Sequence, residues 1–156
     1  MTKINKGRMF GKMEGDFVVF LIGMRINAFW KIHKWLPVAA AMPRMIKELY
    51  ENEDSGFLGA HGWFGRTAIM LQYWRSFEHL ESYAKDKSRE HFPAWKKFNQ
   101  KIRDSGAAGV WHETYKVSAG TYENIYVNMP DFGLGKAGKL IKVADKYESA
   151  RERIKE

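Results

Sequence analysis

Apolar and polar positions in the first third of the chain change from a strand-like to a helix-like pattern. Residues 16–27 are apolar at both odd and even positions, which is typical of a central β-strand, and the odd positions turn polar at Arg25 and Asn27. Over residues 38–49 the apolar side chains recur at helical spacing. We therefore expect a strand followed by a helix, which Pro43 starts or kinks because proline has no backbone N–H to donate.

The middle of the chain predicts a hairpin followed by helices. Residues 57–65 and 67–74 have strand-like patterns, and the short link at Gly65 and Arg66 favours a turn between them. Ser76 is a good helix N-cap because its hydroxyl can accept a hydrogen bond from a free backbone N–H. A second apolar stripe predicts another helix that starts near Ser88 and ends at Ser105.

The two ends of the chain have a weaker pattern. Residues 1–14 are basic and show little periodicity, so we expect an N-terminal extension there. Further strands are predicted over residues 110–117 and 122–128. Residues 129–156 are interpreted as a C-terminal tail that ends in a charged helix over residues 143–155. No internal repeat is apparent, and we expect one domain over residues 1–156.

The order of these elements is strand, helix, strand, strand, helix, strand, followed by an added strand and a tail helix. This is the split βαβ, ferredoxin-like pattern of an α+β protein, in which helices cover one face of an antiparallel sheet. The other face of the sheet is partly apolar and aromatic here, so a monomer would expose it to water. We therefore expect a homodimer in which two sheets close face to face, a dimeric α/β barrel.

Composition and charge narrow the classes of partner and compartment. The 156 residues include 15% aromatic residues, which favours a wide core or an aromatic cavity, and no cysteine, which excludes disulfides and thiolate chemistry. The excess of 26 basic over 18 acidic residues is spread over several regions, so we expect no nucleic acid partner. The longest apolar run, residues 17–24, is too short for a membrane span, and no small-residue cleavage site follows it. We expect a cytoplasmic protein.

Three familiar kinds of site find little support in the sequence. Residues 133–138 formally match a glycine-rich phosphate loop, but they follow no βαβ unit, and we expect this segment to pack across the barrel without binding a nucleotide. No two of the five histidines stand at metal-ligand spacing, so we expect no metal. No nucleophile elbow of a serine hydrolase is present. Haem stays open as an alternative cofactor because one axial histidine suffices to hold it.

Several motifs resemble a known superfamily. Residues 74–84, WRSFEHLESYA, resemble the strand-to-helix signature of antibiotic-biosynthesis monooxygenases, which are dimeric α/β barrels. Residues 91–95, 109–115 and 128–135 resemble a bacterial family of unknown function that is grouped with a fungal monooxygenase of the fumagillin pathway. The resemblance covers residues 15–153 and implies several mechanisms. Cofactor-free members oxidise quinols or enols after a base removes a proton, and the carbanion then reduces oxygen directly.

Relatives that degrade haem surround it with an asparagine, a tryptophan and a histidine. Asn27 and His91 match two of these positions by resemblance, but Tyr83 stands closest to where the tryptophan would be. The three-residue set is therefore incomplete.

We accordingly expect a monooxygenase-like enzyme that needs no cofactor and acts on a small apolar or aromatic, electron-rich substrate. His91, or in second place His112, would be the base, because imidazole titrates near working pH. Arg25 and Asn27 would stabilise a developing oxyanion. The residues expected to line the pocket are Trp63, Trp74, Tyr83 and Tyr126. Two alternatives are a haem enzyme of the aldoxime dehydratase or haem oxygenase kind and a non-catalytic ligand-binding dimer.

Overall fold

A four-stranded antiparallel sheet is the centre of the fold in the computed structural model, which describes residues 2–89, 92, 96, 98, 100, 103–144 and 147–154. Its strands are β2 (Phe17–Ile26), β3 (Phe57–Trp63), β4 (Thr67–Trp74) and β5 (Ala108–Val117). The strand order β3-β4-β2-β5 places the apolar strands β2 and β4 in the middle. This is the ferredoxin-like order, so the predicted α+β class, the first strand and the hairpin are confirmed.

Helices cover one face of this sheet. They are α1 (Ile32–Ala39), α2 (Ala41–Glu51) and α3 (Phe77–Lys85), with the short 3₁₀ turns η1 (Glu53–Ser55) and η2 (Arg103–Ser105). Pro43 lies in the first turn of α2, where a missing N–H breaks no helical hydrogen bond. The Ser76 hydroxyl accepts from the His79 backbone N–H at 3.4 Å, so the predicted N-cap is confirmed. The helix predicted from Ser88 lies largely outside the described residues. No described helix is long and apolar enough to cross a membrane.

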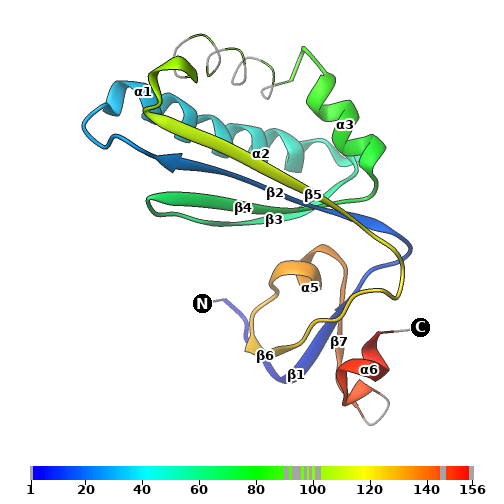
Figure 1. Cartoon of the computed structure of the whole chain (residues 1–156). Coiled ribbons are helices and arrows are strands. Elements are labelled where there is room, and N and C mark those ends of the chain that lie inside the picture. Colours follow the sequence, from blue (N-terminus) through cyan, green and yellow to red (C-terminus); the bar gives the residue numbers. More distant parts are fainter. Residues whose placement is uncertain are drawn as a thin grey trace.

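A second, smaller sheet lies on the other side of the larger sheet, opposite the helices (Figure 1). It has the order β6-β1-β7, and two short helices accompany it. The elements are β1 (Asn5–Lys12), β6 (Tyr126–Met129), α5 (Gly133–Ala137), β7 (Lys139–Lys142) and α6 (Ala150–Arg153). The two ends of the chain therefore meet in one sheet.

Three expectations about these ends are wrong. Residues 1–14 are no plain extension, because β1 forms the middle of the smaller sheet; its alternation is hidden because only one end of the strand is buried. The strand expected over residues 122–128 is limited to β6, and it joins this second sheet. The charged C-terminal helix is limited to α6, because Ser149 caps it and the chain before it is already paired as β7.

The glycine-rich segment of residues 133–138 packs against the body of the protein as expected. Leu134 is buried beside Tyr73 and Phe17. A Cβ atom at Gly11 would come within 2.6 Å of the Gly135 nitrogen, so the backbones of β1 and α5 touch directly. The glycines therefore serve the contact between α5 and β1.

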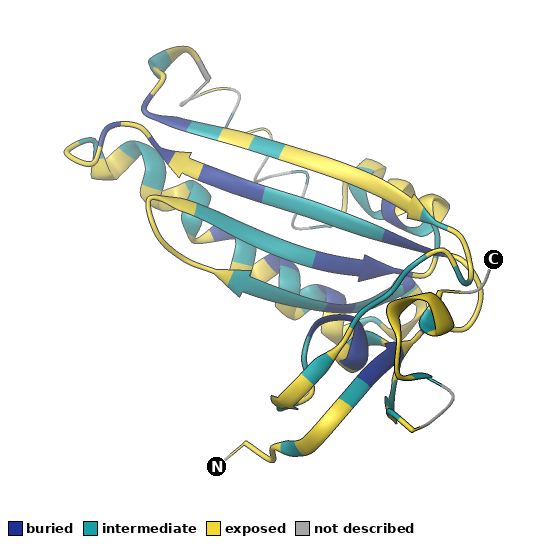
Figure 2. Ribbon diagram, turned by 60° about the horizontal axis from the view of Figure 1, so that its bottom comes forward, coloured by how far each residue is buried: buried dark blue, intermediate teal, exposed yellow. Residues whose placement is uncertain are grey.

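The two faces of the larger sheet are buried to different extents. Even-numbered residues of β2 face the helices, where Val18 and Trp74 form a core with Leu49 and Leu80. Odd-numbered residues of β2 face the smaller sheet, which covers only one end of that face through contacts of α5 with β3 and β4. Figure 2 shows β5 exposed over most of its length. We call these two surfaces the helix-covered face and the open face.

Candidate functional site

The structure divides the predicted site residues between the two faces. The register between β2, β4 and β5 places Trp74 and His112 on the helix-covered face, and Tyr83 approaches that face from α3. The residues associated with the open face are Arg25, Asn27, Trp63 and Tyr126. His91 lies outside the described residues. The predicted residues therefore do not form one cluster, and the chemistry of each face has to be considered separately.

A small cavity of about 40 Å³ lies between the helices and the sheet, and we call it the helix-side cavity. It has room for a few water molecules at most, so a substrate has to displace side chains to enter. Two of its walls are the flexible thioethers of Met42 and Met45, which suit such a movement. The lining residues are Phe20, Ile22, Met42, Met45, Leu49, Gln72, Trp74, Leu80, Tyr83 and Ala84.

Gln72 is the polar group of this cavity. Its side chain is 5% exposed, and among the described residues it is the one buried polar residue. Its Oε1 accepts a hydrogen bond from the Trp74 indole Nε1 at 2.9 Å. The Nε2 amide has no hydrogen-bond partner within the described part of the chain. A buried donor of this kind costs stability unless something accepts from it, so it is available to a ligand oxygen.

Gln72 was not among the predicted site residues, although its position in the sequence carries a signal. Gln72 interrupts the apolar run Ile69–Trp74, on a strand that lies in the middle of the sheet. A polar residue at such a position is informative because it has to be satisfied or functional.

Tyr83 and Trp74 form the aromatic side of the helix-side cavity. Their ring centroids lie 5.8 Å apart, and Trp74 is fully buried. The Tyr83 hydroxyl donates to Glu48 Oε2 at 3.0 Å, and the Arg89 guanidinium lies 3.8 Å from the same carboxylate. The carboxylate thus fixes the direction of the tyrosine hydroxyl, which Tyr83 alone would leave free to rotate.

His112 lies at the rim of the same cavity. It is paired with Ile22 across β2 and β5, and its ring centroid is 5.7 Å from that of Phe20. Both Phe20 and Ile22 line the cavity, whereas the His112 side chain itself is exposed. An imidazole beside this cavity is a candidate for a proton acceptor.

The open face carries a different set of groups. The Arg25 guanidinium donates to Thr67 Oγ1 at 3.0 Å, and the Asn27 amide donates to the Gly106 carbonyl at 3.1 Å. Trp63 is 44% exposed and packs its ring 4.6 Å from that of His61. The Phe132 ring packs against both, with its centroid 4.2 Å from that of His61 and 6.0 Å from that of Trp63.

Glycine on β2 permits one further close contact on the open face. A Cβ atom at Gly23 would lie 2.6 Å from the Trp111 Nε1, so the indole crosses the strand where no side chain stands. The result is an aromatic surface rather than a cavity.

Two tyrosines lie where α5 covers the open face. Burial raises the pKa of the Tyr73 phenol to about 12, and the neighbouring Tyr126 adds to this effect, whereas a hydrogen bond from the Leu134 backbone opposes it. Burial also raises the pKa of Tyr126, whose hydroxyl accepts from the Gly135 N–H at 3.4 Å. Tyr126 is thus tied to the glycine-rich segment and belongs to the packing of the smaller sheet.

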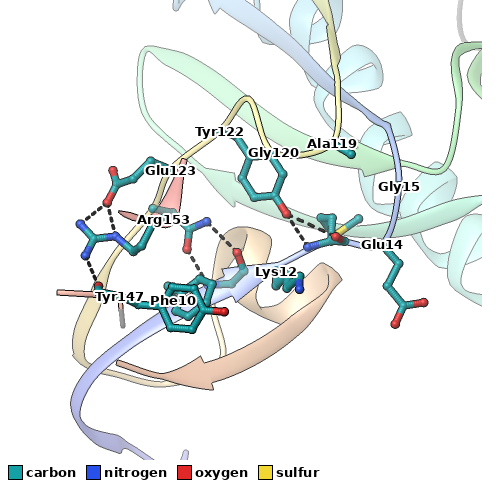
Figure 3. A pocket seen from close by; sticks show the side chains of 13 residues that line it. Phe10, Lys12, Glu14, Gly15, Ala119, Gly120, Tyr122, Glu123, Tyr147 and Arg153 are labelled. Atoms are coloured by element: carbon teal, nitrogen blue, oxygen red, sulfur yellow. Dashed lines mark hydrogen bonds and ion pairs between the residues drawn. The ribbon is translucent and has the colours of Figure 1, made fainter. Parts of the chain in front are cut away.

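A larger cavity of about 390 Å³ lies beside the smaller sheet, between β1 and the loop of residues 119–124 (Figure 3). Several of its polar side chains are bonded to backbone groups or to each other. Asn124 exchanges two hydrogen bonds with the Gly11 backbone, and the Arg153 guanidinium pairs with Glu123 and donates to the Tyr147 carbonyl at 2.7 Å. These contacts hold the smaller sheet together and leave few groups for chemistry. Among the described residues no cluster of three or more carboxylates and histidines offers a metal site.

A family model described as Monooxygenase af470-like matches residues 17–134. Every residue that lines the helix-side cavity falls within this segment, whereas the larger cavity is lined mostly by residues outside it. The chain is also 27% identical to Monooxygenase af470 of Aspergillus fumigatus, over 94% of this chain and 54% of that protein. It therefore spans about half the length of this curated relative.

The chain is also similar to solved structures. An aldoxime dehydratase superposes with a TM-score of 0.66 at 15% identity, over 83% of this chain and 42% of that chain. SnoaB of Streptomyces nogalater, a cofactor-independent oxygenase, superposes with a TM-score of 0.46 at 10% identity, over 64% of this chain and 91% of that chain.

Proposed function

The chain belongs to the monooxygenase af470-like family, and on that premise we propose that it is a cofactor-free oxygenase whose reaction takes place in the helix-side cavity. The observation that carries the proposal is Gln72, a buried amide whose donor is unused by the described residues in a cavity with otherwise apolar and aromatic walls. Such a cavity favours a small apolar, electron-rich molecule with one oxygen to be recognised.

The proposed reaction requires only the substrate, molecular oxygen and a base. A base removes a proton from an acidic C–H group next to an aromatic ring or carbonyl, and the carbanion passes an electron to oxygen. The resulting radicals combine to form a carbon–oxygen bond, which gives a peroxide. Loss of water from the peroxide turns the CH₂ group into a carbonyl. One oxygen atom ends in the product and the other in water, together with the two hydrogens of the CH₂ group.

The helix-covered face supplies a group for each step. His112 is the candidate for the base among the described residues, and His91, the first choice from the sequence, lies outside them. The Gln72 Nε2 amide donates to the substrate oxygen on which negative charge develops, which is the role that the sequence analysis gave to Arg25 and Asn27. Trp74 and Tyr83 hold the substrate ring, and the Glu48 carboxylate keeps the Tyr83 hydroxyl in place.

The open face supports a second part of the proposal, the homodimer. Leu21 and Ile69 are only half-buried there, and Trp63 and Tyr115 are 44% and 50% exposed. A second copy that closes over this face would remove these side chains from water.

Oxygen uptake tests the proposed reaction. Protein treated with a chelator and dialysed is added under air to a panel of anthrones and related aryl ketones that carry an acidic CH₂ group, and oxygen consumption is recorded. The proposal expects consumption above the buffer rate for at least one member, with one product oxygen derived from labelled O₂. A folded protein that leaves the whole panel at the buffer rate, or that becomes active only after haem, flavin or metal is added, contradicts it. Saturable binding of the panel without turnover would instead identify a ligand-binding protein.

A further inference from the structure

One end of the larger sheet carries two strongly exposed aromatic side chains. Phe64 and Trp30 are 80% and 79% exposed. They belong to two connections at the same end of the sheet, which lies at the left in Figure 1: the link from β2 into α1 and the turn between β3 and β4. We call residues 27–36 and 64–66 together the aromatic tip.

The two parts of the aromatic tip are joined to each other. The Ile26 N–H donates to the Arg66 carbonyl at 2.8 Å, and Arg66 Nε donates back to the Ile26 carbonyl at 3.4 Å. The Arg66 guanidinium also lies 5.7 Å from the centroid of the Phe29 ring, which is a cation–π distance. The exposed side chains are therefore presented on linked loops.

Helix α1 is apolar on two sides. Its inner side packs Trp35 and Val38 against the core of Met24, Ile26 and Ala108. Its outer side shows Ile32 and Leu36, one turn apart and 53% and 50% exposed. None of the eight residues of α1 is buried. A surface helix normally buries one apolar side in the core and exposes a polar side to water. The apolar outer side of α1 is therefore a candidate contact surface.

The chain segments that contain the aromatic tip carry basic residues and no acidic ones. No acidic residue occurs in residues 17–47 or 56–77. Among their basic residues, Lys31, Lys34 and Arg66 belong to the aromatic tip and Arg25 lies near the end of β2 beside it, whereas Arg75 follows the opposite end of β4. Asp104 in η2 is an exposed acidic side chain near this end, since the neighbouring Ala107 carbonyl accepts from the Asn27 N–H at 3.0 Å. Anionic groups are the complement of this surface.

We propose that the aromatic tip docks the protein on the surface of an anionic phospholipid membrane, without spanning it. Tryptophan and phenylalanine favour the boundary between headgroups and acyl chains, and lysine and arginine beside them attract anionic headgroups. Trp30, Phe64 and the outer side of α1 enter the interface, and Lys31 and Arg66 remain at the level of the headgroups. This docking goes beyond the proposed reaction and does not depend on it.

Vesicle sedimentation tests the docking. The protein is mixed with vesicles of phosphatidylcholine alone or with about one quarter phosphatidylglycerol, and the bound fraction is measured at low and high salt. We expect binding to the anionic vesicles that weakens in high salt. The double substitution Trp30→Ser with Phe64→Ser should lower the partition coefficient at least about tenfold, and Lys31→Glu should lower it by about three- to tenfold. The matched control, Ile4→Ser with Val127→Ser, removes two exposed apolar residues elsewhere and should bind like the original protein.

A second measurement does not depend on the variants. Lipids brominated at shallow acyl positions should quench tryptophan fluorescence of the original protein but much less that of the Trp30→Ser variant. Absence of binding to anionic vesicles, equal binding by the tip variant and its control, or equal quenching in the two proteins would overturn the proposal. If the tip variant changes the sedimentation mass and not vesicle binding, the aromatic tip is a protein–protein surface and the membrane proposal is wrong.

Discussion

Over residues 17–22 of β2 the two faces of the larger sheet carry equal numbers of apolar side chains, but the two faces differ in what covers them. On the helix-covered face α2 and α3 bury Val18 and Trp74 completely, and Gln72 lies among these apolar groups. On the open face α5 covers only the end near Phe17, and Trp63 stays 44% exposed. The same strand pattern thus gives a finished core on one side and an incomplete one on the other. We assign the proposed reaction to the helix-covered face and the contact with a second copy of the chain to the open face.

The largest effect is expected from removing a tryptophan on each face in turn. Trp74→Ala should lower the free energy of unfolding by about 3–5 kcal/mol, because it leaves a cavity in a fully buried core. Trp63→Ala should cost less than about 1.5 kcal/mol within a single chain, since that side chain is partly in water already. Urea unfolding at a protein concentration low enough to keep the chain monomeric measures both. Equal decreases in the free energy of unfolding would mean that Trp63 is as well packed within one chain as Trp74.

A charge placed on the open face tests the homodimer. Leu21 lies between Leu71 and Glu113 on that face, so Leu21→Lys leaves the added ammonium hydrated in a monomer but buries it between two sheets in a dimer. We expect the dissociation constant to rise at least about a hundredfold. Analytical ultracentrifugation over a range of concentrations gives the constant, and Val127→Lys, on the smaller sheet, is the matched control. An original protein that remains at the single-chain mass at all concentrations excludes the homodimer.

The covered end of the open face has a signature at alkaline pH. The folded pKa of Tyr73 is about 12, above the usual value of 10.0, so its contribution to stability is complete below about pH 10. Between pH 10 and 12 the unfolded chain loses the phenol proton while the folded chain keeps it, and the free energy of unfolding falls by about 2–3 kcal/mol. For the Tyr73→Phe variant, the decrease in the free energy of unfolding between pH 10 and 12 should be smaller by this amount. Identical pH profiles would show that Tyr73 is hydrated.

The sequence predicted the larger sheet better than the smaller one for a physical reason. Strands β2 and β4 each have only one exposed residue, Arg25 and Thr67, so their apolar pattern is continuous. Strand β1 is buried mainly at Phe10 and Gly11, and its basic residues hide the alternation. The pairing of β1 with β6 and β7 joins residues more than a hundred positions apart, which no local pattern reports.

The site was predicted only in part. The alternation of side chains along a strand correctly places His112 and Trp111 on opposite faces of the sheet. It does not show which face the helices cover, so the predicted pocket combined residues of both faces. Gln72 became visible as a site residue only when its burial and its bond to Trp74 were known. These are properties of packing between distant elements.

The claim that the helix-covered face carries the chemistry is tested most directly by a pair of matched substitutions, one on each face. Gln72→Leu removes the buried amide donor, and Arg25→Gln removes the exposed guanidinium of the open face. With any accepted anthrone or related aryl ketone, oxygen uptake should give a kcat/KM about 10²-fold lower for Gln72→Leu and within about twofold of the original for Arg25→Gln. Melting temperatures identify any loss due to unfolding, since Gln72→Leu also leaves the Trp74 N–H without its acceptor. A folded Gln72→Leu protein with full activity, or an Arg25→Gln protein that has lost it, would contradict the assignment.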